Sequence, residues 1–508
     1  MMINIIDHSF FFTSLERDCI AHADTCVETR PGSFVTSLFH SLWYFLDCAL
    51  VPETVAPNAI TLAGLMASIQ SYQIVNEYYD GNCSTKDFTG YAPILLSCLL
   101  CVVAIICGAL DGVHAKRCRS ATPLGDIFAR VCSSILRIFF ALTLMKAFCV
   151  DNILTQWYVL MVLQLIEFNT VLGRISAENL EGAKFKSLVY HITYWFRDSE
   201  LSFLILCALI ARVVFPGHAL YFPTSVNILR NCFAALVVVS FTNVVLLKMK
   251  SRYKVAIAVC LATRVVPLFN ILPFTNNSVF SLLSGSLAIA LLSIEMHVSN
   301  VAQRRVHAAV ICICVGSVLN DVLSIAASVL YIVGMLADLS YSTRIPLFVP
   351  VKNVFCDGVF DLCHAGHKNF LQNALVHGNR LVVGVCGDDE CEVYKRRPIM
   401  TTAERVNEVK MCKFVSQVIP NSPVSGITEE MIKRYNIHVV VCGDEYNHPD
   451  DKYYAVPRRM GILRTAPRTD GISTSELIAR IRAENDADLA AKDKARNRQA
   501  VPEGSQLQ

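Results

Sequence analysis

The chain has 508 residues, of which 54% are hydrophobic and 17% charged, and its mean hydropathy is +0.45. Soluble domains average about 25% charged residues, so this composition excludes an entirely soluble protein. The net charge is only +3 and long basic runs are missing, which excludes a typical nucleic-acid-binding protein. The 21 cysteines lie mostly in apolar runs, and no Cys/His spacing of a zinc site occurs, so we expect no dedicated protein cage for a metal.

The first 57 residues show none of the features of a secretory signal peptide, and SLFHSLWYFLDCAL (37–50) predicts an interfacial helix. Residues 58–340 then contain repeated apolar segments, which predict a multi-pass bundle of about ten transmembrane helices. The segments are 58–75, 93–110, 131–150, 153–172, 201–215, 229–247, 255–274, 279–297, 308–319 and 322–338.

Basic residues gather in alternate loops of this bundle, and the positive-inside rule places those loops and both termini in the cytosol. The opposite loops carry glycosylation sequons at Asn82 and Asn276, which favours a lumenal position for them. The basic residues are Lys116, Arg117, Arg119, Lys184, Lys186, Lys248, Lys250, Arg252, Lys254, Arg304 and Arg305.

From residue 345 the pattern changes to short apolar runs that alternate with amphipathic segments. KNVFC, RLVVGVC and HVVVCG predict buried strands, and helices are expected at 366–377, 402–413 and 427–435. Residues 345–483 therefore predict an α/β, Rossmann-like domain with a parallel sheet. The polar, alanine-rich tail 484–508 is expected to be disordered.

Two motifs of this domain indicate phosphate binding. DGVFDLCHAGH (357–367) places His364 and His367 three residues apart at an expected helix start, where free N–H groups and the helix dipole favour an anion. RTDGISTSELI (468–478) offers the guanidinium of Arg468, and its hydroxyl residues precede a second helix. Ordinary surface histidines would explain the first motif alone, but not the pair of motifs.

HxGH followed by RTxGIST(S/T) resembles the cytidylyltransferase family, whose members join CTP to phosphocholine, phosphoethanolamine or glycerol 3-phosphate. The resemblance covers about residues 350–482 and implies attack of a phosphomonoester on CTP, assisted by Mg²⁺ and without a protein nucleophile. It implies catalytic roles for His364, His367, Lys395 and Arg468. The residues implied to bind CTP are Val359, Phe360, Gly366, Arg405, Asp444, Thr469, Gly471, Ser473 and Thr474.

A cationic head group needs aromatic faces or carboxylates. Those available near the motifs make Asp361, Tyr446 and Tyr453 expected phosphoalcohol-binding residues, although Tyr453 and Tyr454 are equally explained as a packing pair. The resemblance implies that Lys395 also binds the phosphoalcohol, by contacting the phosphates of both substrates. Val424 stands where choline-type and ethanolamine-type members usually carry an aromatic residue. Choline is favoured, and ethanolamine remains a close alternative.

The sequence LDGVHAKRCRSATPLGDIFARVCSS (110–134) resembles the DxxDGxxAR and GxxxDxxxD signature of CDP-alcohol phosphotransferases, and the resemblance spans about residues 38–340. Three of the four metal-binding aspartates are replaced, by Gly108, Ala129 and Ser133, so we expect no catalysis there. Asp126 is one residue out of register. The retained motif residues are Asp111, Gly112, Ala115, Lys116 (for arginine) and Gly125.

The favoured interpretation is a membrane-tethered cytidylyltransferase of the endoplasmic reticulum or Golgi, with a cytosolic catalytic domain. The alternatives are a bifunctional enzyme that also transfers the phosphoalcohol to diacylglycerol, and a non-catalytic lipid or nucleotide sensor. Expected partners are CTP, phosphocholine or phosphoethanolamine and membrane lipids, with no nucleic acid; a homodimer is left open.

Overall fold

The computed structural model describes residues 10–21, 38–79, 92–150, 152–179, 198–214, 226–246, 251–265, 279–394 and 396–499. The chain divides into a helical unit, Met1–Pro350, and a sheet unit, Val351–Gln508. Each unit is described by itself. The two sequons lie outside the described residues, as do Lys395 and four of the eleven basic loop residues, Lys184, Lys186, Lys248 and Lys250.

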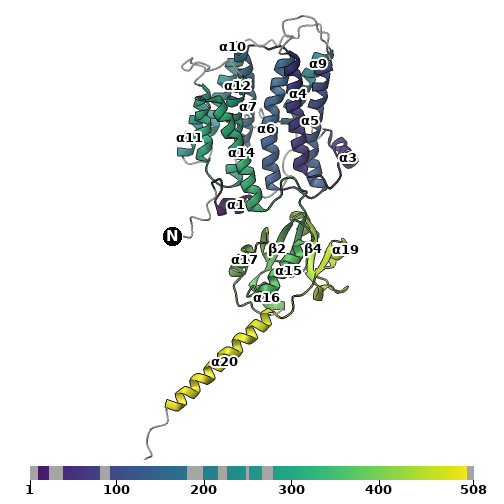
Figure 1. Cartoon of the computed structure of the whole chain (residues 1–508), viewed down its shortest axis with the longest axis vertical. Helices are drawn as coiled ribbons and strands as arrows, with labels where there is room; N and C mark the ends of the chain where they lie inside the picture. Colours follow the sequence, from purple (N-terminus) through teal and green to yellow (C-terminus); the bar gives the residue numbers. More distant parts are fainter. Residues whose placement is uncertain are drawn as a thin grey trace, which may run out of the picture. The chain divides into compact units, whose positions relative to one another are not determined.

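The helical unit is a bundle of long helices (Figure 1). Its described helices are α1 (Ser14–Ala21), α3 (His40–Leu50), α4 (Pro57–Tyr79), α5 (Ala92–Arg117), α6 (Pro123–Ala147), α7 (Ile153–Asn179), α9 (Asp198–Val214), α10 (Val226–Leu246), α11 (Ser251–Val265), α12 (Val279–Val301), α13 (Ala308–Gly316) and α14 (Asp321–Thr343). A helix thus occupies each of the ten apolar segments identified in the sequence.

Five of the described helices, α5, α6, α10, α12 and α14, are long and apolar enough to cross a membrane. Others are too short by themselves: the 9 residues of α13 span only about 14 Å at 1.5 Å per residue, against a hydrocarbon core of about 30 Å. The structure therefore supports a membrane protein with five candidate spans, and ten complete crossings stay a prediction.

Helix α3 covers the expected interfacial segment, but it is fixed to the bundle by charge. Asp47 is fully buried and accepts from the ring of His114 at 2.8 Å, and Arg117 lies 2.8 Å from its other oxygen. Both partners belong to the last turns of α5. The outer face of α3 still exposes Leu42, Tyr44 and Phe45, as an interfacial helix should.

The sheet unit contains five parallel strands in the order β3-β2-β1-β4-β5, which confirms the predicted α/β class. Its elements are β1 (Asn353–Gly358), α15 (Ala365–Leu375), β2 (Arg380–Cys386), α16 (Asp388–Tyr394), α17 (Thr402–Lys410), β3 (Gln417–Ser422), α18 (Glu429–Arg434), β4 (Ile437–Gly443), the 3₁₀ turn η5 (Asp444–Tyr446), α19 (Ala455–Arg459), β5 (Leu463–Ala466) and α20 (Thr474–Gln499). The three predicted strands are the central ones.

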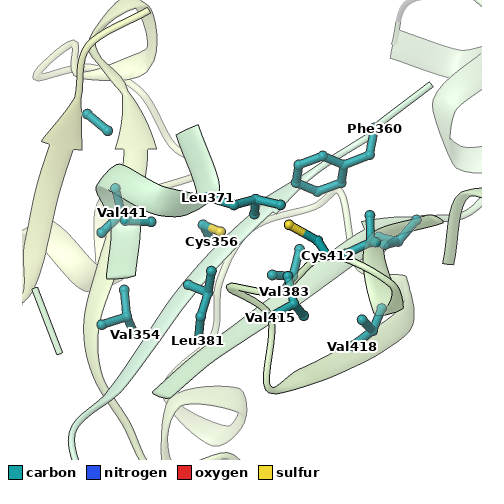
Figure 2. Close-up of a cluster of buried hydrophobic side chains, with 14 of the residues drawn as sticks. Val354, Cys356, Phe360, Leu371, Leu381, Val383, Cys412, Val415, Val418 and Val441 are labelled. Carbon is teal, nitrogen blue, oxygen red and sulfur yellow. The ribbon is translucent and has the colours of Figure 1, made fainter. Parts of the chain in front are cut away.

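The central strands are buried on both faces, which is why they consist of continuous apolar runs. On β1, Val354 and Cys356 join one hydrophobic cluster with Leu371 of α15, and Phe355 joins the cluster on the opposite face. Figure 2 shows the first cluster between the sheet and α15, with Phe360 at its margin. Phe360 belongs to this cluster and lies in the loop that precedes the two histidines, so the loop is packed against the hydrophobic core.

The tail differs from the expectation of disorder, because α20 continues to Gln499. Its residues 479–492 are all exposed, so no apolar face packs on the rest of the sheet unit. The composition includes several alanines and charged residues of high helix propensity, which favour helix without tertiary support. The prediction of disorder is therefore wrong for residues 484–499, which are polar but contain no glycine or proline to interrupt a helix.

Candidate active site

The two motifs meet at the carboxyl end of the sheet. The strand order reverses at β1, which pairs with β2 on one side and β4 on the other. In open parallel sheets ligands bind outside the carboxyl ends of the strands at this point. The loop after β1 leads to His364, with Phe360 and Leu362 in the left-handed region at φ 54° and 48°. Such conformations in non-glycine residues mark a constrained loop of the kind found at functional sites.

The two histidines form a capping box at the start of α15. Nδ1 of His364 accepts from the backbone N–H of Gly366 at 3.1 Å, and Nδ1 of His367 accepts from the backbone N–H of His364 at 3.4 Å. Both Nδ1 atoms therefore act as acceptors and carry no proton. In a neutral imidazole the proton is then on Nε2, so each ring has one outward N–H donor.

Burial keeps both rings neutral, and the neighbouring His364 adds to this effect on His367. The rings stack with centroids 4.0 Å apart. Burial, and then the neighbouring His364, lower the pKa of His367 to about 4; burial also lowers the pKa of His364. At neutral pH the site thus presents two uncharged donors side by side at a helix N-terminus, an arrangement suited to a developing negative charge.

The second motif closes onto the first, although about 100 residues separate them. Thr474 Oγ1 donates to the carbonyl of Asp361 at 3.1 Å and lies 3.4 Å from Nε2 of His364. A Cβ built on Gly366 would lie 2.9 Å from the His364 ring and 3.4 Å from Ile472, so a larger residue would displace the imidazole. Gly471 has φ 77°, which turns the chain into α20, and Ser473 accepts from the N–H of Glu476 at 3.2 Å.

Two of the expected ligand-binding residues are engaged in holding loops. Asp361 is 3% exposed and its carboxylate accepts from the backbone N–H groups of Ile399 and Met400 and from Arg396. Arg405 is fully buried and donates to Asp388 at 2.5 Å and to the carbonyls of Val359 and Met400. Both side chains fix the backbone around the histidines, and their polar atoms are occupied in this arrangement.

The structure adds a site residue that the sequence motifs did not single out, Asp357 at the end of β1. Tyr453 donates a hydrogen bond to one of its carboxylate oxygens, and the Tyr454 hydroxyl donates to the other at 3.1 Å. The two phenol rings meet edge to face, 4.7 Å between centroids. Burial raises the pKa of Asp357, while the two hydroxyl donors oppose that rise. A signal existed in the sequence: Asp357 directly precedes the motif glycine at a strand end.

The other expected residues lie on the rim. Arg468 and Asp444 are exposed; Arg468 forms an ion pair with Glu445 at 3.1 Å, within the 3₁₀ turn that follows β4. Tyr446 is 39% exposed in the same turn. Lys395 lies outside the described residues, so its position relative to the histidines stays a prediction.

In the helical unit, the retained signature residues flank the turn between α5 and α6. Asp111 accepts from Thr61 of α4 at 2.8 Å and from the N–H of Gly112, and the N–H of Gly125 donates to Thr122 at 3.0 Å. Asp126 is bound by Arg130 at 3.3 Å and His297 at 3.2 Å. Ala115 lies on the last turns of α5 and Lys116 is exposed there. Carboxylates here have protein partners.

Comparison with known proteins places a family on the sheet unit. Residues 355–480 match the family model described as Cytidylyltransferase-like. The chain is 36% identical over 138 residues to the probable ethanolamine-phosphate cytidylyltransferase of Encephalitozoon cuniculi, a match covering 27% of this chain and 42% of that protein. It is also 36% identical over 136 residues to human choline-phosphate cytidylyltransferase A, covering 26% of this chain and 36% of the relative.

These matches span less than half the length of either relative, and the helical unit lies outside them. Among solved structures, the lipopolysaccharide core biosynthesis protein of Thermoplasma volcanium GSS1 is 20% identical, over 24% of this chain and 99% of that one. Its TM-score of 0.21 is too low to bear on fold or function. The paired motifs and the family match together show that the sheet unit is a cytidylyltransferase-like domain.

Proposed function

We propose that the chain is a membrane-held cytidylyltransferase that converts CTP and phosphocholine or phosphoethanolamine into the CDP-alcohol and pyrophosphate. The observation that carries this proposal is the pair of Nε2–H donors of His364 and His367 beside Thr474. A bundle of donors at one helix N-terminus suits a polyphosphate better than any neutral substrate. The similarity to ethanolamine-phosphate and choline-phosphate cytidylyltransferases supports the same assignment.

In the proposed reaction an oxygen of the phosphomonoester attacks the α-phosphorus of CTP, and the bond from that phosphorus to the bridging oxygen of pyrophosphate breaks. No proton-abstracting base is required, because the attacking phosphate oxygen is already anionic. The imidazole N–H groups stabilise charge that moves onto the leaving pyrophosphate, which is where preorganised donors contribute most. Arg468 and the hydroxyls of Ser473 and Thr474 would close over the triphosphate.

The remaining expected residues have positional roles in this proposal. Val359, Phe360 and Gly366 bring backbone close to the phosphates, and Gly471 and Thr469 shape the second loop. Lys395 would bridge the phosphates of both substrates, and Asp444 lies on the rim for the nucleoside. In the described part of the chain, no three His, Cys, Asp or Glu side chains are grouped to hold a metal. In this proposal the oxygens of CTP would hold the Mg²⁺.

The Asp357–Tyr453–Tyr454 cluster supports a cationic head group. A carboxylate with two aromatic rings beside it can recognise an ammonium group, whereas glycerol 3-phosphate has no positively charged group to pair with the carboxylate. Head-group binding would relieve the cost of holding the Asp357 carboxylate away from water. Choline and ethanolamine both meet this requirement, and Tyr446 lies in the 3₁₀ turn that follows the neighbouring strand β4.

For the helical unit we propose a membrane anchor derived from a CDP-alcohol phosphotransferase that has lost its chemistry. The support is the replacement of three metal-binding positions by Gly108, Ala129 and Ser133. A two-metal site needs several carboxylates. Asp126 is instead paired with Arg130 and His297, and Asp111 is hydrogen-bonded to the hydroxyl of Thr61. The anchor would hold the catalytic domain at an endoplasmic reticulum or Golgi membrane.

The test is an assay of the purified full-length protein in lipid nanodiscs with CTP, Mg²⁺ and one acceptor: phosphocholine, phosphoethanolamine or glycerol 3-phosphate. We expect CDP-alcohol and pyrophosphate in equal amounts with the first two acceptors only. Arg468→Ala, His364→Ala and His367→Ala should each lower turnover by about a hundredfold or more. Turnover with none of the acceptors, or near-normal turnover in all three variants, would refute the proposal.

A further inference from the structure

The segment that leaves the helical unit is folded back onto it. Helix α14 ends at Thr343, and the next residue, Arg344, turns the chain in the left-handed region at φ 54°. Ile345 is 1% exposed, and its carbonyl accepts from Ser340 at 2.8 Å. We call residues 344–349 the connector. A flexible linker would not bury its first apolar side chain so completely.

Two further contacts hold the connector against α4 and α6. The Asn58 side-chain amide donates to the carbonyl of Leu347 at 2.8 Å. The ring of Phe348 meets the ring of Phe128 edge to face, with centroids 5.6 Å apart and an interplanar angle of 89°. Phe128 is itself 6% exposed and therefore belongs to the bundle core. The bundle therefore contacts the connector both through a backbone carbonyl, that of Leu347, and through a side chain, that of Phe348.

These contacts belong to the same patch as the retained phosphotransferase-like residues. Asn58 lies one helical turn before Thr61, which donates to Asp111 at 2.8 Å. Gly125 lies one turn before Phe128, and a Cβ added to it would be 3.4 Å from Asn58 Oδ1 and 3.1 Å from Thr122 Oγ1. Gly125 therefore lies directly beside the Asn58 amide that holds Leu347. Asp111 accepts from Thr61 and so fixes the adjoining turn of α4.

We propose that the patch formed by Asn58, Thr61, Asp111, Gly125 and Phe128 is a docking site for the connector. This gives the surviving half of the signature a present role that requires no metal and no nucleotide. It does not depend on which phosphoalcohol the sheet unit uses, nor on whether that unit is catalytic.

Docking changes the length of free chain before the sheet unit. From Thr343 to Val351, the first residue of the sheet unit, eight steps could extend about 28 Å; with the connector docked, only the two steps from Val349 remain, about 7 Å. The patch thus sets the reach of the catalytic domain. Release of the connector would more than double that reach.

Limited trypsin digestion of the full-length protein in nanodiscs tests the docking, because cleavage after Arg344 requires residues on both sides of the bond to leave the bundle. The readout is the rate at which a fragment beginning at Ile345 appears, followed by mass spectrometry. Asn58→Ala and Phe348→Ala should each accelerate its appearance about fivefold, since fivefold corresponds to about 1 kcal/mol, the net value of one such contact.

The matched control is Asn152→Ala, which removes an asparagine that caps α7 through the N–H groups of Leu154 and Thr155, at the opposite end of α6. It should leave the Ile345 fragment unchanged. Phe348→Ala lies in the connector and leaves the bundle residues intact, so it remains informative if Asn58→Ala folds poorly. Unchanged cleavage in Phe348→Ala, or an equal acceleration in Asn152→Ala, would overturn the proposal.

Discussion

Replacing His364 by asparagine separates the two roles that the structure gives this residue. Its Nδ1 accepts from the Gly366 N–H and caps α15, while its Nε2–H is the proposed donor to phosphate. Asparagine is among the best N-cap residues, so its side-chain oxygen can replace Nδ1 as the acceptor. The amide is too short to reach the position of Nε2. The substitution therefore keeps the helix cap and removes the donor.

The two effects have different expected sizes. Loss of one preorganised donor to a developing oxyanion lowers kcat about 10²- to 10³-fold, or about 2.7–4 kcal/mol in transition-state stabilisation. The free energy of unfolding should change by less than about 0.5 kcal/mol, because the cap is retained. His364→Ala should show the same loss of kcat together with a loss of stability of about 1 kcal/mol.

The assay is CDP-alcohol formation under saturating CTP, paired with chemical unfolding of the same preparations. Thr428→Asn serves as the matched control, because Thr428 caps α18 by accepting from the Met431 N–H at 3.2 Å, in a helix outside the proposed site. It should leave both kcat and stability nearly unchanged. Activity of His364→Asn within tenfold of the wild type would refute the proposed donor role.

Four further predictions concern the pH dependence of stability, the head group, the topology and the phosphotransferase-like unit. Stability of residues 351–508 should fall as pH drops from about 6.5 toward 4, by up to about 3 kcal/mol, because the folded pKa of His367 lies below the value of about 6.5 expected in the unfolded chain. Chemical unfolding at several pH values checks this, and His367→Asn should flatten the dependence. Asp357→Asn should raise KM for the phosphoalcohol about 10- to 100-fold and leave KM for CTP nearly unchanged, since a charged partner is worth about 1.5–3 kcal/mol; a rise confined to CTP would contradict the head-group assignment. In sealed microsomes the sheet unit should be digested by external protease, and protection would reverse the topology. The full-length protein should form no phospholipid from a CDP-alcohol and diacylglycerol, and product that disappears in Asp111→Asn would establish the bifunctional alternative.

The phosphate-binding half of the candidate site is local in the sequence. A capping box involves residues three apart, so the HxGH spacing by itself placed His364 and His367 at a helix start. The central strands were equally predictable from the sequence, because a strand buried on both faces consists of a continuous apolar run. The edge strands β3 and β5 were not: β3 contains Pro420 and is largely polar, and β5 has four residues. Edge strands tolerate both features, and their pairing is set by neighbours.

The lengths of the apolar runs also predicted the division into a helical part and an α/β part. Long apolar runs are typical of membrane helices, and short apolar runs are typical of buried strands. The same approach wrongly predicted disorder for the tail that forms most of α20, because polar, alanine-rich composition is typical both of exposed helices and of disordered segments.

Tertiary structure alone decided the roles that depend on distant partners. Asp357 and Tyr453 are 96 residues apart in the sequence, and only the fold, in which β1 pairs with β4, brings the carboxylate and the phenol together. Asp361 resembles a head-group ligand in the sequence, yet the backbone N–H groups of Ile399 and Met400 occupy it. Likewise, Asn58 and Leu347 meet across 289 positions. A carboxylate or amide forms hydrogen bonds only with groups about 3 Å away, so its partners depend on which groups the fold brings that close. Sequence spacing encodes that separation only within a single helix or turn.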